Sequence, residues 1–83
     1  MQELVEAIIK PVLTKFCIDY SLIEDYNDDK TVGYRLDFVI FKEPVRMIID
    51  IDKISSRVRC NGKILTTETF NKKVSRLVNE ASK

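Results

Sequence analysis

The sequence predicts a single α+β domain in which a helix, an antiparallel sheet and a second helix follow one another. Apolar residues recur at helical spacing in residues 2–18 and again from residue 70 to residue 81. Between them, residues 32–42 alternate as a strand does, and Asn61-Gly62 is the strongest short hairpin signal in the chain. We therefore expect one domain over residues 1–83, with a meander of four to five strands and both helices packed on one sheet face.

The first helix is expected over residues 2–18. Its apolar stripe consists of Leu4, Val5, Ile8, Val12 and Phe16, widened by Ile9 and Leu13. Pro11 interrupts this pattern, because proline lacks an N–H and crowds the carbonyl of Ala7. Two outcomes remain open: a kinked helix, or a break at Lys10 with Pro11 starting a new helical segment.

Three strands are expected next, over residues 20–26, 32–42 and 45–52. The first turn lies in residues 27–30, which are rich in turn-forming side chains. The second turn is assigned to Lys42-Glu43-Pro44, because proline cannot donate to a strand ladder. The middle strand should point five apolar side chains to one face: Val32, Tyr34, Leu36, Phe38 and Ile40.

The pairing of the two middle strands follows from their alternation. The residue numbers of two opposed positions should sum to about 87, which pairs Phe38 with Ile49, Asp37 with Asp50 and Arg35 with Asp52. This register collects six apolar side chains on one face: Leu36, Phe38, Ile40, Met47, Ile49 and Ile51. A slip of one residue would destroy that segregation.

The last hairpin should join residues 57–60 to residues 63–65 through the Asn61-Gly62 turn. Thr66 or Thr67 then caps the final helix, and Glu68 lies in its first turn. The apolar stripe of this helix consists of Phe70, Val74, Leu77, Val78 and Ala81.

Composition argues against an enzyme. The chain contains no histidine, which removes the commonest general base and the usual imidazole metal ligand. It also lacks the G-x-x-x-x-G-K-[ST], G-x-G-x-x-G and C-x-x-C motifs. We therefore expect no catalytic residues, no cofactor and no metal site.

The chain is expected to work in the cytoplasm. It has no apolar run of about 18 residues, and its first residues, with Gln2, Glu3 and Glu6, do not resemble a secretory leader. Cys17 and Cys60 each lie among apolar neighbours and are interpreted as free, core-forming thiols in a reducing compartment. A single bridge between them is the alternative.

A partner-binding surface is predicted on the sheet face away from the core. It consists of Asp37, Val39, Phe41, Ile48 and Asp50. Val39, Phe41 and Ile48 supply an apolar centre, and the acidic residues supply part of a polar rim. Asp37, Asp50 and Asp52 share this face, so three interpretations stay open: a solvated acidic face balanced by Arg35 and Arg46, a dock for a basic partner, or a divalent-metal site.

The charge is divided along the chain. Residues 1–52 carry 6 Lys/Arg against 11 Asp/Glu, and residues 53–83 carry 8 against 2. The basic residues that could follow a phosphate backbone are Arg57, Arg59, Lys63, Lys72, Lys73 and Arg76, and Lys83 adds to the excess. They make a nucleic-acid-binding domain the alternative function.

One stretch resembles a known family. Residues 3–13 (Glu-Leu-Val-Glu-Ala-Ile-Ile-Lys-Pro-Val-Leu) are similar to the opening helix of small bacterial KH-domain RNA-binding proteins. The G-x-x-G loop of that family is not matched, since Gly62-Lys63-Ile64-Leu65 lacks the second glycine. The resemblance implies RNA binding and supports only the nucleic-acid alternative.

The leading interpretation is a non-catalytic protein-binding module that acts as an adaptor or an inhibitor of a larger machine. Its small size and split charge fit accessory proteins, including those that phages encode. A protein partner is expected, nucleic acid is the alternative partner, and a homodimer would supply stability that an 83-residue chain lacks alone. No membrane contact is expected.

Overall fold

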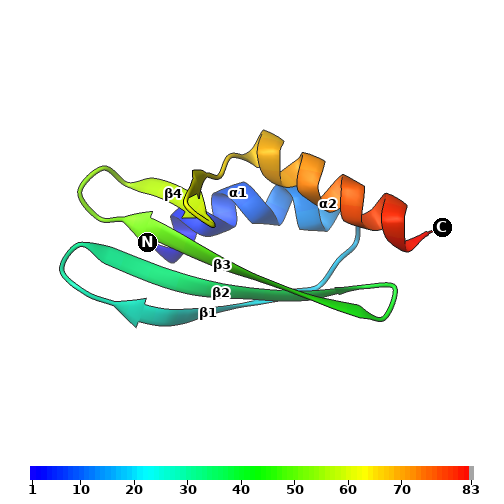
Figure 1. The fold of residues 1–83 in the computed structure, drawn as a ribbon, viewed down its shortest axis with the longest axis horizontal. Coiled ribbons are helices and arrows are strands. Elements are labelled where there is room, and N and C mark those ends of the chain that lie inside the picture. Colours follow the sequence, from blue (N-terminus) through cyan, green and yellow to red (C-terminus); the bar gives the residue numbers. More distant parts are fainter. Residues whose placement is uncertain (83) are drawn as a thin grey trace.

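The computed structural model describes residues 1–82 and confirms the α+β meander. Lys83 lies outside the described residues. The elements, in chain order, are α1 (Gln2–Lys15), β1 (Tyr20–Asn27), β2 (Thr31–Ile40), β3 (Glu43–Asp52), β4 (Arg57–Cys60), β5 (Lys63–Ile64) and α2 (Thr67–Ala81). The strands form one antiparallel sheet in the order β1-β2-β3-β4-β5. Figure 1 shows both helices on the same side of this sheet, where they contact each other.

The helix α1 continues through Pro11 without a break. Val5, Ile9 and Leu13 are fully buried, while Pro11 lies on the exposed side. Burial of each large apolar side chain is worth about 1.5–3 kcal/mol, so this stripe offsets the roughly 3 kcal/mol that an internal proline costs.

The core lies between the helices and the inner face of the sheet, which is the face that the helices cover. Leu36, Ile49 and Ile51 from the sheet and Phe70 and Val74 from α2 are fully buried. Within residues 1–82, no polar or charged residue is buried. The inward set predicted from the alternation of residues 32–51 is therefore confirmed.

The predicted register of β2 and β3 is wrong by four residues. Phe38 pairs with Val45 rather than Ile49, Asp37 pairs with Arg46, and Gly33 pairs with Asp50. The turn between the strands is the two-residue Phe41-Lys42, not a loop around Pro44. A shift by an even number leaves every side chain on its predicted face, so the segregation of apolar residues could not distinguish the two registers.

Pro44 lies inside β3, opposite Val39, and not in the turn as predicted. Ile40 and Glu43 flank the two-residue turn and are a hydrogen-bonded pair, so the next pair, Val39 and Pro44, is of the non-bonded kind. The nitrogen of Pro44 therefore points away from β2. Since β4 pairs only with Ile49–Asp52, that nitrogen meets no neighbouring strand in the part of the chain that the structure describes.

The last hairpin and helix form as the sequence predicts. Asn61 and Gly62 both have positive φ, and Thr66 caps α2 by accepting a hydrogen bond from the Thr69 backbone N–H at 3.1 Å. Across residues 1–82, no helix is long and apolar enough to span a membrane.

The two cysteines are free thiols, as predicted. Cys60 is buried among the core residues, but Cys17 is exposed and does not belong to the core. Cys17 follows Phe16, the C-cap of α1, and has a φ of 57°, so the chain turns there and leaves the Cys17 side chain exposed.

Candidate protein-binding surface

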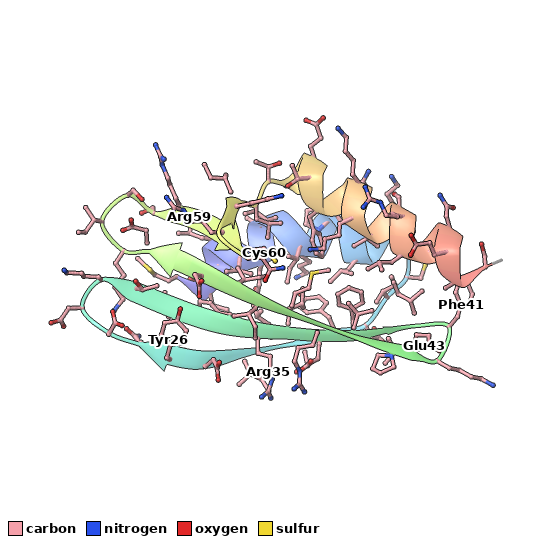
Figure 2. The ribbon with its side chains drawn as sticks, viewed as in Figure 1. Tyr26, Arg35, Phe41, Glu43, Arg59 and Cys60 are labelled. Carbon is pink, nitrogen blue, oxygen red and sulfur yellow. The ribbon has the colours of Figure 1, made fainter. Side chains whose placement is uncertain are left out.

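The face of the sheet away from the helices, called the outer face here, carries side chains in rows across the strands. One row consists of Ser21, Asp37 and Arg46, and the next of Ile23, Arg35 and Ile48. In Figure 2, Arg35 points away from the helices on this side. Four of the five predicted partner-binding residues, Asp37, Val39, Ile48 and Asp50, belong to this face by their register.

Asp37 lies between two arginines. Its carboxylate accepts a hydrogen bond from Arg46 Nε at 2.8 Å and another from Arg35 Nε at 3.1 Å. The hydrogen bond from Arg46 lowers the pKa of the Asp37 carboxyl, and the positive charges of both arginines lower it further. The charge of Asp37 is thus balanced by Arg35 and Arg46, and Asp37 does not lie opposite Asp50 as the sequence predicted.

Asp50 makes a separate polar link, about two rows away. Its carboxylate accepts a hydrogen bond from the Tyr26 hydroxyl, and this bond and partial burial raise the pKa of Tyr26 to about 12. The Tyr26 ring crosses Gly33, where a Cβ atom would overlap the ring. A β-bulge between Glu24 and Tyr26 turns Tyr26 to this face.

The third carboxylate, Asp52, stabilises the turn that follows β3. It accepts hydrogen bonds from the backbone N–H of Ile54 at 2.9 Å and of Ser55 at 3.4 Å, which lower its pKa. Asp37 lies four register positions from Asp50, roughly 13 Å at about 3.3 Å per residue. The three aspartates therefore do not converge, and residues 1–82 contain no group of three acidic, cysteine or histidine residues that could hold a metal.

The tip of the β2–β3 hairpin exposes the largest apolar side chain of the predicted surface. Phe41 is 65% exposed and Val39 is 56% exposed. Phe41 and Lys42 have φ angles of 48° and 76°, a conformation that costs an L-residue about 1–2 kcal/mol. In Figure 2, Phe41 lies at the end of the hairpin near the last turn of α2.

An open groove of about 1060 Å³ adjoins this tip. It lies where β2 extends past the start of β1, because Tyr20 pairs with Phe38 and leaves Val39 and Ile40 beyond the end of β1. Phe41 and Pro44 line it on the hairpin side. Phe41, Val39, Pro44 and this groove form what we call the tip surface.

The basic residues of the nucleic-acid alternative divide between two layers. Arg57 and Arg59 lie opposite Asp52 and Asp50 on the outer face. Lys72, Lys73 and Arg76 belong to α2, on the other side of the sheet, and Lys72 pairs with Glu68 at 3.5 Å. Lys63 shares the orientation of Cys60, toward the inner face. The nucleic-acid alternative stays a prediction, with no single surface that collects all six residues.

Two residues of the outer face were not predicted there: Tyr26 joins it through the bulge and Pro44 through the shorter turn. Arg46 was expected to balance the acidic residues of this face, and the shifted register places it opposite Asp37. A glycine inside a strand often marks a close approach, so Gly33 was a signal for the Tyr26 ring. No sequence pattern indicated which aromatic residue would cover it.

Comparison with known proteins adds no assignment: no family model, curated protein or solved structure matches this chain.

Proposed function

We propose that this chain is a non-catalytic protein-binding module, an adaptor or an inhibitor of a larger assembly, that holds its partner through the tip surface. The observation that supports this most is the exposure of Phe41 at a turn whose backbone disfavours phenylalanine. Exposed aromatic side chains beside a groove are typical anchors of protein interfaces.

The turn chemistry supports a role other than folding. At Asn61-Gly62 the chain uses the residues that suit two consecutive positive φ angles. At Phe41-Lys42 it adopts the same signs of φ with residues that do not suit them. Backbone strain of this kind is concentrated at functional sites. There, the free energy gained when the exposed side chain binds its partner offsets the cost of the strained backbone.

The surroundings of the tip have the composition of an interface. Val39, Phe41 and Pro44 give an apolar centre, and the Asp37 and Arg46 pair, in the next row, gives a charged border. Such a border is solvated and adds selectivity for a partner more than affinity.

The test is partner capture with matched variants. Phe41→Asp should remain folded and reduce capture of the partner by at least about tenfold, because it places a charge where an apolar anchor must be buried. Ile54→Asp is the control, since Ile54 is 84% exposed but lies in the distant turn after β3. Undiminished capture by a folded Phe41→Asp variant would eliminate the tip surface as the binding site.

The free thiols of Cys17 and Cys60 support action in a reducing compartment, and we propose the cytoplasm. The proposed partner is another protein. A homodimer through the tip surface is the competing arrangement, and a concentration-dependent solution mass that Phe41→Asp abolishes would identify it.

A further inference from the structure

Strand edges that lack a neighbour differ in how well they are protected. The edge strand β5 has only two residues. The part of β3 that extends beyond β4 carries Pro44, which removes a donor from that edge. The other edge strand, β1, has eight residues and contains neither proline nor lysine. Lysine, proline, short length, charge and bulges are the usual protections of edge strands. In β1 the bulge and the acidic residues come only from Glu24 onward, so the start of β1 is the open edge of this sheet.

The hydrogen-bonding direction of each residue in β1 follows from Pro44. Because Val39 and Pro44 are a non-bonded pair, β2 directs the backbone groups of Val39, Asp37 and Arg35 toward β1. Their partners Ser21 and Ile23 therefore bond to β2. The residues between and beside them, Tyr20, Leu22 and Glu24, direct their N–H and C=O groups outward, ahead of the bulge at Asp25.

Acidic side chains surround this edge from two elements. Asp19, Glu24 and Asp25 lie on or next to β1. From α1, Glu6 lies near enough to Tyr20 for its charge to raise the pKa of that hydroxyl, after the larger effect of burial. Glu3 and Glu24 raise the pKa of Tyr34 in the same way. Lys10 lines the small cavity beside Tyr20, Arg35 lies opposite Ile23 on the outer side, and Lys53 donates a hydrogen bond to Asn27 at the end of β1.

The two sides of the edge thus differ in chemistry. On the inner side, where Tyr20, Leu22 and Glu24 point, the charge of Glu24 is joined by that of Glu6, which acts on Tyr20 from α1. On the outer side, Ile23 is 47% exposed beside Ser21, and Arg35 is the next residue in its row. A strand placed here would alternate its side chains between an acidic border and an apolar one.

We propose that the edge of β1 binds an extended, basic segment of a partner protein as a sixth strand, with Lys or Arg side chains toward Glu6 and Glu24 and apolar side chains beside Ile23. This inference rests on the proposed function for the class of partner but uses the edge of β1, which adjoins the groove of the tip surface at Tyr20. Main-chain hydrogen bonds at Tyr20, Leu22 and Glu24 supply the affinity, and the alternating side chains supply the selectivity. A second copy does not fit, because two β1 edges would place acids opposite acids.

The probe is a synthetic peptide of about seven residues in which Lys and Val alternate. We expect it to bind the full chain, and to bind less tightly as salt is raised. An analogue with Glu in place of Lys should bind at least about tenfold more weakly. An analogue N-methylated at every second residue keeps the charge but cannot complete the ladder, and it should also lose at least about tenfold. Equal affinity of the N-methylated analogue, or no binding of the parent peptide, would overturn the proposal.

Variants of the chain separate this site from the tip surface. Glu24→Pro removes one outward N–H, whereas Glu24→Thr loses the same charge and keeps the N–H. The peptide should bind Glu24→Pro several-fold more weakly than Glu24→Thr, and equal binding would contradict the ladder. Phe41→Asp should leave peptide binding unchanged, so the two proposals fail independently. A salt-sensitive dimer of the unmodified chain, lost in Glu24→Pro, would replace the basic segment with a second copy and overturn the choice of partner.

Discussion

The two faces of the sheet contrast in what their side chains accomplish. On the inner face, Leu36, Ile49 and Ile51 are fully buried under α1 and α2. On the outer face, polar links such as Arg46–Asp37 and Tyr26–Asp50 lie among exposed apolar residues. Burial of these apolar side chains on the inner face stabilises the fold. The apolar residues of the outer face gain little from folding, so their exposure is informative about binding.

The largest difference is expected from matched truncations on the two faces. Leu36→Ala should lower the free energy of unfolding by about 2–5 kcal/mol, because it leaves a cavity beneath the helices. Ile48→Ala, at a site 39% exposed on the outer face of the neighbouring strand, should lower it by about 1 kcal/mol or less. Urea denaturation measures both. Similar losses would mean that something covers the outer face.

A smaller effect is expected at the close approach of Tyr26 to Gly33. Gly33→Ala should cost about 1–3 kcal/mol, because the new methyl group displaces the ring and breaks the hydrogen bond to Asp50. In a Tyr26→Ala background the same substitution should cost much less, since the obstacle is gone. A double-mutant cycle by urea denaturation gives the coupling, and additive costs would refute the packing of this ring.

The turn at the hairpin tip should respond in the opposite direction. Replacing Phe41-Lys42 with Asn-Gly should raise the free energy of unfolding by about 1–2 kcal/mol, because it relieves two disfavoured φ angles. The same variant should lose partner capture. A stabilised variant that still captures the partner would separate strain from binding and weaken the assignment of Phe41.

The smallest effect concerns acid. The folded pKa of Asp37 is lowered by Arg46 and Arg35, so its contribution to stability is present above the unfolded value of about 3.9 and is lost as pH falls through the folded pKa. Asp37→Asn should therefore lose less stability than the unmodified chain when the urea midpoint is compared at about pH 7 and about pH 3. Arg46→Gln should show the same smaller decrease in the urea midpoint. A decrease as large as that of the unmodified chain in both variants would show that the Asp37–Arg46 pair does not contribute to stability.

The order of elements and the face of nearly every strand residue could be predicted because alternation and helical spacing are local properties. The β2–β3 register could not, because a shift of four residues preserves every face and only the choice of turn distinguishes the two pairings. Pro44 suggested a turn, yet it fits β3 because its nitrogen faces an open side. The Tyr26–Asp50 link joins two strands across a third, and the local pattern contains no information on such a distance.

The charge excess of residues 53–83 teaches a related lesson. In sequence it suggests one basic footprint, but alternation directs Arg57 and Arg59 to the outer face while α2 carries its lysines on the opposite layer. A count along the chain cannot distinguish a patch from two separated groups. For the same reason, the sequence did not indicate an acidic border of β1, because only the fold brings Glu6 near Tyr20 and Glu3 near Tyr34.

Pro44 affects the tendency of the protein to aggregate at high concentration. An exposed hairpin with an apolar tip can nucleate intermolecular β-sheets. Because Pro44 has no backbone N–H, a strand of a neighbouring molecule cannot accept a hydrogen bond at this position of β3. The side chains of Val39 and Phe41 at the hairpin tip nevertheless stay exposed. The open side of β3 is therefore a poor template for fibres even though Phe41 and Val39 stay exposed.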